Sequence, residues 1–317
     1  MILVTGASGY VGNNLVRRLV ELGQPVRAMV YSPAKAEVRL ADVRGSVEIV
    51  RGDVTRPETL GPALDGVTAV IHLVAIAIEK GDQTYERINI QGTVHLVEAM
   101  KAAGVRRLIN MSQNGADSAS PYRFLASKGR AQDVVAASGL DWTALRPSVI
   151  WGPQDEFANV QARLIKLTPL IFPIVGDGQA KFQLVWVGDV VEAAARCLDD
   201  PATIGREYAL GGPEVLTYRE IVARVLRSLQ TRRLMINVPV PLLRPLIWLM
   251  QIALPHPPVT ISLLDMLKVE NTVAQNALTD VFNITPRPFV PENLAYMRQF
   301  SAVGSIKRLL GQSTADE

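Results

Sequence analysis

Three glycines near the start of the chain have the residue type and spacing needed to bind phosphate. Gly6, Gly9 and Gly12 follow the short apolar run 2–5 and come directly before a helical pattern that starts at Asn13. Glycine allows a tight turn and close approach of the backbone to pyrophosphate, and a helix N-terminus offers free N–H groups and positive partial charge. In this strand–turn–helix context the motif predicts a dinucleotide-binding site; the alternative is a tight turn that binds nothing.

The Gly-x-x-Gly-x-x-Gly spacing resembles that of the extended and atypical short-chain dehydrogenase/reductases. The resemblance extends over most of residues 1–215, through the runs 52–54, 70–75, 145–153 and 187–190 and through Asn89 in the helical run 88–93. It implies that Asp53 contacts adenine, although Asp53 could instead start a turn ahead of Pro57, and that the run 70–75 lies under the nicotinamide ribose. The resemblance thus implies bound NAD(P)(H) at Thr5, Gly6, Ser8, Gly9, Tyr10, Val11, Gly12, Tyr31, Ser32, Lys35, Asp53, Val54, Leu73, Val74, Ala75, Asn89, Lys128 and Pro147.

The end of the second expected strand bears on the choice between NAD(H) and NADP(H). In NAD-preferring proteins of this fold an acidic residue here binds the ribose hydroxyls, whereas a basic residue accommodates a 2′-phosphate. The sequence reads Val30-Tyr31-Ser32, which has no acid to repel a 2′-phosphate and lacks the arginine that NADPH-binding relatives often carry at position 31. Lys35, or Arg27 if it lies at the sheet rim, would supply positive charge and Ser32 a hydrogen bond. We therefore favour NADP(H) over NAD(H).

The resemblance also raises a question about catalysis. Family members that oxidise or reduce use a tyrosine four residues before a lysine, with an upstream serine or threonine; the lysine favours the phenolate, which exchanges a proton. Here Ser112 and Lys128 are present, but Phe124 stands four residues before the lysine and has no proton to exchange. Tyr122 is six residues before Lys128, about 120° from its helix face. The candidate catalytic residues are therefore Lys128, Ser112 and, as a replacement for the missing tyrosine, Tyr122.

Three segments resemble one subgroup of this superfamily. The runs 114–117, 120–128 and 258–271 are similar to the nucleotide-binding accessory subunit of respiratory complex I and its bacterial relatives. That family lacks the tyrosine, holds NADP(H) tightly and is thought to serve structure or assembly more than turnover. The resemblance implies a membrane electron-transfer complex, or a membrane surface, as a partner.

The overall pattern predicts an α/β protein with a doubly wound parallel sheet, a Rossmann fold, and a smaller C-terminal α/β lobe. Short β-branched runs alternate with helical patterns through the first half of the chain, as in parallel sheets covered by helices on both faces. We expect the nucleotide-binding domain at 1–150, also receiving about 183–215. The smaller lobe is expected at 151–182 and 216–311, followed by a tail at 312–317.

Composition narrows the possible partners and location. The 33 basic and 30 acidic residues are spread along the chain, which argues against nucleic acid as a partner. His95 and His256 lack neighbouring ligands at suitable spacing, so we expect no metal site. The single cysteine, Cys197, suits a reducing compartment, and the first strand begins at Met1 or Ile2, which leaves no room for a signal peptide. We expect a cytoplasmic protein, with peripheral attachment to the inner face of a membrane as an option.

The segment 241–254 is apolar on nearly every side of its helical pattern. Arg244 and Gln251, seven residues apart, form one narrow polar stripe. Such a helix is normally buried. Two alternatives stay open: burial in the second lobe of this chain, or docking on a partner or a membrane surface; a membrane-spanning helix is disfavoured by Pro245 and the polar residues.

These observations favour an NAD(P)(H)-binding accessory or assembly protein of a membrane electron-transfer complex of the NADH:quinone oxidoreductase type. A second reading is an active NAD(P)H-dependent reductase, dehydrogenase or epimerase acting on a nucleotide sugar, an isoprenoid or a quinone. A third is a redox sensor that binds oxidised and reduced NADP(H) differently. The fold is compatible with all three, because function lies in the site.

Overall fold

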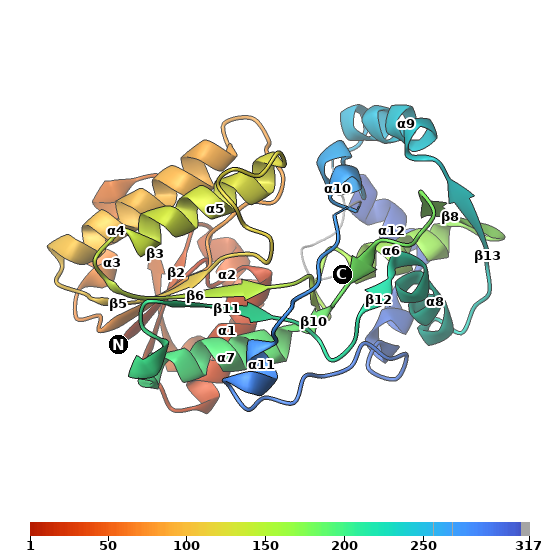
Figure 1. Ribbon diagram of the computed structural model, residues 1–317. Helices are drawn as coiled ribbons and strands as arrows, with labels where there is room; N and C mark the ends of the chain where they lie inside the picture. The colour runs from red at the N-terminus through yellow and green to blue at the C-terminus, as the bar shows by residue number, and fades with distance from the viewer. Residues whose placement is uncertain (256, 268, 312–317) are drawn as a thin grey trace. The chain divides into compact units, whose positions relative to one another are not determined.

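The computed structural model describes residues 1–255, 257–267 and 269–311 (Figure 1). His256, Lys268 and the expected tail at 312–317 lie outside the described residues. Contacts along the chain define two compact units. The first comprises Met1–Pro147, Val187–Leu210 and Ala274–Thr285; the second comprises the described residues of Ser148–Trp186, Gly211–Val273 and 286–311.

The first unit contains a seven-stranded sheet in the order β11-β6-β5-β4-β1-β2-β3. All its pairings are parallel. The order reverses between β1 and β4, where Thr5 and His72 are register partners at the carboxyl ends. In open α/β sheets ligands bind outside the carboxyl ends of the strands at such a point. The strands are β1 (Ile2–Thr5), β2 (Val26–Val30), β3 (Val47–Arg51), β4 (Ala69–His72), β5 (Arg107–Met111), β6 (Asp141–Pro147) and β11 (Arg206–Leu210).

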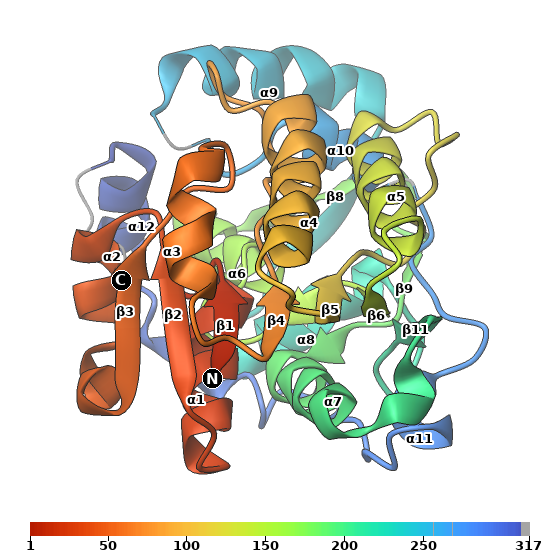
Figure 2. The same cartoon turned by 90° about the vertical axis from the view of Figure 1, so that its left-hand side faces the viewer.

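Helices cover both faces of this sheet, which confirms the predicted doubly wound α/β fold. In Figures 1 and 2, α3 (Leu60–Leu64), α4 (Gly92–Ala102) and α5 (Arg123–Ala136) lie on one face, and α1 (Tyr10–Glu21) and α7 (Val187–Asp199) on the other. Apolar side chains of the strands and helices form the core between the layers, among them Leu3, Val70, Leu96 and Leu108. The remaining helical segments of the unit are α2 (Pro33–Arg39), η1 (Ala41–Ser46), η2 (Pro57–Thr59), the π-helical η3 (Glu86–Gln91), η4 (Pro201–Thr203) and α11 (Ala277–Asp280).

The segment 274–285 differs from expectation, because it belongs to the first unit although the sequence placed it in the smaller lobe. The ring of Phe282 packs edge-on against Tyr208 of β11, with centroids 5.1 Å apart. Arg196 of α7 donates a hydrogen bond to the Phe282 carbonyl. A lone aromatic contact between segments this far apart leaves no periodic signal in the sequence.

The second unit is the expected smaller α/β lobe, and its core is aromatic. The Trp151 ring packs against the Trp186 ring, with centroids 4.5 Å apart, and edge-on against the Phe289 ring, with centroids 5.3 Å apart. Helix α8 begins with a capping box formed by Thr217 and Glu220. The elements of the second unit are β7 (Ile150–Trp151), α6 (Ala158–Leu167), β8 (Ile171–Val175), β9 (Lys181–Phe182), β10 (Val185–Trp186), β12 (Leu216–Thr217), α8 (Tyr218–Ser228), β13 (Leu234–Val238), α9 (Val240–Ala253), α10 (Ile261–Met266), η5 (Ala295–Gln299) and α12 (Ala302–Leu309).

The second unit does not bury helix α9, so the first alternative, burial in the second lobe of this chain, does not hold. Ile247 is its only buried residue. Its other large apolar side chains include five that are each more than half exposed: Leu242, Leu246, Trp248, Leu249 and Ile252. Among the described residues, no helix combines the length and the apolar character needed to cross a bilayer.

Candidate functional site

The glycine turn connects β1 to α1, and each of its glycines has a structural reason. Gly6 has φ +70°, a left-handed conformation that favours glycine. A Cβ on Gly12 would lie 2.2 Å from the Gly6 carbonyl oxygen, so only glycine lets the helix start pack on the turn. Gly9 donates to the Gly6 carbonyl at 2.9 Å and is the N-cap of α1. The backbone is thus folded tightly at the start of a helix.

The electrostatics of this turn suit an anion. A glycine N-cap has no side chain to accept hydrogen bonds from the first N–H groups of α1, and the first turn contains no acidic residue. The N–H groups and the positive end of the helix dipole therefore meet no competing carboxylate there. Ser8 is buried within the turn, and Tyr10 and Val11 form the first turn of the helix. A pyrophosphate fits this cradle.

The segment that follows β4 lies against the turn. A Cβ on Gly6 would be 3.3 Å from Val74 Cγ2 and 3.4 Å from the Leu73 carbonyl carbon. The Leu73 N–H donates to Thr5 Oγ1 at 3.3 Å. Thr5, Gly6, Leu73 and Val74 are therefore brought together, and Ala75 follows them as an exposed residue.

His72 is the last residue of β4 and belongs to a buried polar network. Its Nδ1 is 2.8 Å from Thr5 Oγ1 and its Nε2 is 3.3 Å from Thr93 Oγ1. Burial, with a smaller effect of the Lys128 charge, lowers the pKa of His72 to about 3. The ring is neutral at physiological pH and connects two threonines, which is a structural arrangement.

Ser112 follows the carboxyl end of β5, and the side chain of Lys128, a residue of α5, reaches the same end. The Lys128 Nζ donates to the Met111 carbonyl oxygen at 2.7 Å, and burial lowers the pKa of this lysine to about 8. Ser112 follows directly, and its buried Oγ has no hydrogen-bond partner among the described residues. A buried hydroxyl without a partner is costly unless a ligand satisfies it. This oxygen is therefore a fit for a polar group of a bound molecule.

Asn89 supports the same region from the π-helical segment η3. Its side chain accepts from the Ile76 N–H at 2.8 Å and donates to the Ile76 carbonyl at 3.2 Å and to Ser127 Oγ at 3.0 Å. Asn89 thus fixes the loop after β4 to helix α5. The hydrogen bonds of its side chain are therefore made to Ile76 on one segment and to Ser127 on the other.

Phe124 and Tyr122 occupy different positions at the start of α5. The Phe124 ring packs against Tyr85 with centroids 6.0 Å apart, and the Tyr85 hydroxyl donates to the Ala77 carbonyl at 2.7 Å. Tyr122 is the N-cap of α5, with extended backbone at φ −91° and ψ 112°. The helix therefore begins after Tyr122. Tyr85 was not among the sequence candidates, because it lies 39 positions from Phe124 and no local pattern connects the two.

The opposite end of the site lies after β2 and β3. Tyr31 is exposed; Ser32 caps α2 by accepting from the Lys35 N–H at 3.4 Å, and Lys35 is exposed on the first turn. Arg27 does not lie at this rim: it is near the amino end of β2 and pairs with Glu48 at 3.0 Å. Lys35 is thus the basic side chain that the sequence singled out and that lies beside Ser32.

Asp53 organises a turn after β3. Its Oδ1 accepts from both the N–H and the hydroxyl of Thr55 at 2.8 Å. Val54 is buried, and its carbonyl is 2.9 Å from His95 Nδ1. Pro147 ends β6, and its carbonyl accepts from the Asn114 N–H at 2.9 Å. Among the described residues, no group of three or more His, Cys, Asp or Glu side chains is placed to hold a metal ion.

The turn, the strand ends and the helix dipole together form the geometry of a dinucleotide site, and comparison with known proteins agrees. A family model described as NAD(P)H-binding matches residues 6–165. The chain belongs to this NAD(P)H-binding family. Its fold and its relatives are of the short-chain dehydrogenase/reductase type.

Two proteins are similar to the chain in sequence and one solved structure is similar to it in fold. The mitochondrial NADH dehydrogenase (ubiquinone) 1 alpha subcomplex subunit 9 of Arabidopsis thaliana is 31% identical over 225 residues, covering 69% of this chain but only 55% of that subunit. The NAD(P)H azoreductase of Xenophilus azovorans is 30% identical, covering 70% of this chain and 72% of the enzyme. The structure of MoeE5 in complex with UDP-glucose and NAD has a TM-score of 0.70 at 22% identity, covering 97% and 98% of the two chains.

Proposed function

We propose that the protein is an NADP(H)-binding accessory or assembly protein of a membrane electron-transfer complex of the NADH:quinone oxidoreductase type, and that it holds the nucleotide without turning it over. The observation that carries this proposal is Phe124, four residues before Lys128 where oxidising and reducing relatives carry a tyrosine. The similarity to the Arabidopsis complex I subunit supports it. That similarity covers about half of the subunit, so the partner is part of the proposal.

Phe124 takes the place of the side chain that would exchange a proton with a substrate, and it leaves the residues proposed to bind the nucleotide unchanged. When a bound nicotinamide gives a hydride to a carbonyl, the carbonyl oxygen must take a proton from a side chain; in the reverse reaction the substrate hydroxyl gives a proton to that side chain. The Phe124 ring has no exchangeable proton, and the Lys128 ammonium donates to the Met111 carbonyl. The glycine turn and the first turn of α1 do not depend on residue 124. This combination supports nucleotide binding without turnover.

The exposed face of α9 supports a protein partner. Leu242, Leu246, Leu249 and Ile252, here called the α9 face, are spaced four, three and three residues apart and share one side of the helix. A single exposed leucine is ordinary, but contiguous apolar surface marks sites of association. We propose that the α9 face packs against the complex.

The end of β2 supports NADP(H) over NAD(H). Ser32 and Lys35 lie together at the start of α2, and no acidic residue occupies positions 30–32. A carboxylate there would repel a 2′-phosphate, whereas a serine hydroxyl and an ammonium group favour it.

The test of the central proposal is the substitution Phe124→Tyr. Wild-type protein is expected to bind NADPH without oxidising it in the presence of quinone or carbonyl acceptors. Phe124→Tyr places a phenol one helical turn from Lys128 and is expected to give acceptor-dependent oxidation above the wild-type level. Phe124→Leu removes the ring without adding a proton donor and should be as inactive as wild type. Wild-type turnover that Phe124→Tyr reduces would contradict the proposal.

A reductase is the second candidate, and one observation favours it. The buried Ser112 Oγ has no partner among the described residues, so it is available to a substrate carbonyl. The azoreductase of Xenophilus azovorans is a similar protein with a redox activity. Steady NADPH oxidation by wild type that Ser112→Ala abolishes would favour this candidate.

A further inference from the structure

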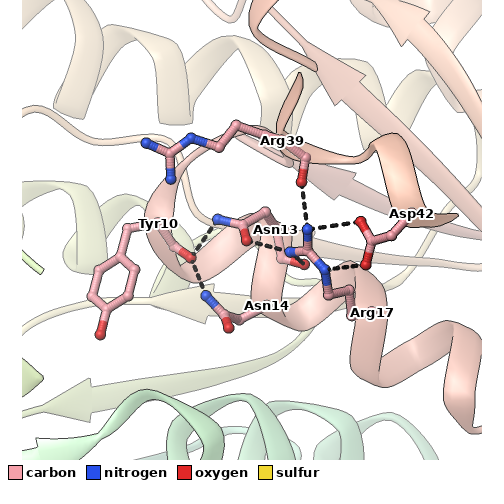
Figure 3. A network of polar contacts seen from close by, with 6 residues as sticks. All are labelled: Tyr10, Asn13, Asn14, Arg17, Arg39 and Asp42. Atoms are coloured by element: carbon pink, nitrogen blue, oxygen red, sulfur yellow. Dashed lines mark hydrogen bonds and ion pairs between the residues drawn. The ribbon is translucent and has the colours of Figure 1, made fainter. Parts of the chain in front are cut away.

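Arg17 on α1 uses all of its hydrogen-bond donors within one network (Figure 3). Its Nε donates to Asp42 Oδ2 at 2.7 Å, and its Nη2 donates to Asp42 Oδ1 at 2.8 Å and to the Arg39 carbonyl at 2.7 Å. Its Nη1 donates to the Asn13 carbonyl at 3.1 Å and to Asn13 Oδ1. A guanidinium has five N–H donors, and this set of acceptors matches all five. The planar fork fits the Asp42 carboxylate with two parallel bonds.

Asn13 extends the network to the glycine turn. The residue is fully buried, and its Nδ2 donates to the Gly9 carbonyl at 2.6 Å and to the Tyr10 carbonyl at 2.9 Å. Asn14 also donates to the Tyr10 carbonyl, at 2.8 Å. The same asparagine that accepts from Arg17 therefore holds the backbone of the phosphate cradle.

Helix α2 is the element at the other end of the network. It has seven residues, of which only Ala36 is buried, and its C-cap Leu40 is also buried. Arg17 holds the carbonyl of its last residue, Arg39, and the carboxylate of Asp42 in the following η1. The hydrogen bond from Arg17 is the main cause that lowers the pKa of Asp42 below its ordinary value, so Asp42 is ionised at neutral pH. Arg17 thus joins α2 and η1 to α1.

We propose that Arg17 is a positioning residue for the 2′ end of the nucleotide, which it never touches. By fixing the carboxyl end of α2 to α1, it sets the distance of Ser32 and Lys35, at the amino end of α2, from the phosphate cradle. The proposal rests on the NADP(H) binding proposed above and adds how the preference for the 2′-phosphate is maintained. Its consequence is selective: NADH, which has no 2′-phosphate, depends on the glycine turn and gains little from the position of Lys35.

The test compares NADPH and NADH affinities of wild type, Arg17→Lys and Asp42→Asn by nicotinamide fluorescence. Lysine keeps the charge but loses the planar fork, so Arg17→Lys is expected to weaken NADPH binding about tenfold, or about 1.4 kcal/mol, with NADH affinity within about twofold of wild type. Asp42→Asn, at a side chain that is 57% exposed, should shift the ratio in the same direction. Titration with 2′,5′-ADP and 5′-AMP repeats the comparison without nicotinamide.

Arg18→Lys is the matched control. Arg18 is the next residue on α1 and pairs with Glu192 of α7 and with Glu21, away from α2. This variant should leave the ratio of NADPH to NADH affinity unchanged. The proposal is overturned if Arg17→Lys weakens both nucleotides equally, or if Arg18→Lys changes the ratio as much. Failure of wild type to bind either nucleotide would instead overturn the proposed function.

Discussion

Lys128 carries an ammonium group in a buried position, and this burial contributes to the pH dependence of stability. Burial lowers its pKa from 10.5 to about 8. Between these values the unfolded chain holds a proton on Lys128 that the folded chain has released, so the free energy of unfolding rises with pH. Below about pH 8 both states are protonated, and the folded state bears the full cost of the buried charge.

Lys128→Met is therefore expected to stabilise the protein while weakening nucleotide binding. Methionine retains an unbranched stem without a charge, and we expect the free energy of unfolding at pH 7 to increase by about 1–3 kcal/mol, the upper end corresponding to the shift in pKa. Urea unfolding at pH 7, 8 and 9 measures this. The gap between variant and wild type should narrow as pH rises; a variant that is less stable, with an unchanged gap, would show that the Met111 hydrogen bond outweighs the buried charge.

Gly12 gives a second prediction for a single residue. A Cβ there would lie 2.2 Å from the Gly6 carbonyl and 2.9 Å from Ala7 Cα, and both are backbone atoms that cannot move away cheaply. We expect Gly12→Ala to abolish NADPH binding and to lower the free energy of unfolding by about 2 kcal/mol or more. Gly45→Ala is the control, because a Cβ there meets no atom within 4 Å; it should be neutral or stabilising by up to about 1 kcal/mol. Equal NADPH affinity in the two variants would show that the turn does not hold the nucleotide.

Some site residues could be predicted from the sequence, and others could not. The three glycines are predictable because each satisfies a local rule of turn geometry within seven residues. Arg17 and Asp42 are 25 positions apart, and each belongs to a different helical segment, so no local pattern connects them. Tyr85 packs on Phe124 through the same kind of distant contact and was missed for the same reason.

Among the elements, α9 gives the sharpest prediction. Leu246→Lys combined with Leu249→Lys places two charges on the α9 face, and we expect loss of association with the membrane complex while NADPH affinity stays within about twofold. Val303→Lys combined with Ile306→Lys is the control, because these two side chains are also exposed, on α12. Co-migration with detergent-solubilised NADH:quinone oxidoreductase from the same source measures the effect. Equal co-migration of both double variants would remove the α9 face from the proposed interface.

The elements also show the limits of periodicity. Strands such as β1, β4 and β5 are predictable because buried parallel strands are short apolar runs bounded by turns. The assignment of 274–285 to the first unit was not, because it depends on the Phe282 ring meeting Tyr208. For α9, an apolar pattern indicates burial but cannot specify what buries it, and the second unit leaves the α9 face exposed.

For the molecule as a whole, two properties define the proposal: a site built to hold a dinucleotide and a helix that exposes apolar side chains. The first lies in the Rossmann unit, and membership in the NAD(P)H-binding family supports it. The second lies in the smaller unit. Together they favour a protein whose bound nucleotide stabilises its fold, since a ligand at 100 times its Kd adds about 2.7 kcal/mol to the free energy of unfolding.

The most direct measurement is a titration of the purified wild-type protein with NADPH and NADH, following nicotinamide fluorescence for binding and its slow loss for oxidation. We expect saturable binding, tighter for NADPH, with no loss of the signal when quinone or carbonyl acceptors are added. Steady acceptor-dependent loss would contradict the central claim, because it would make the protein an enzyme with a proton donor other than residue 124.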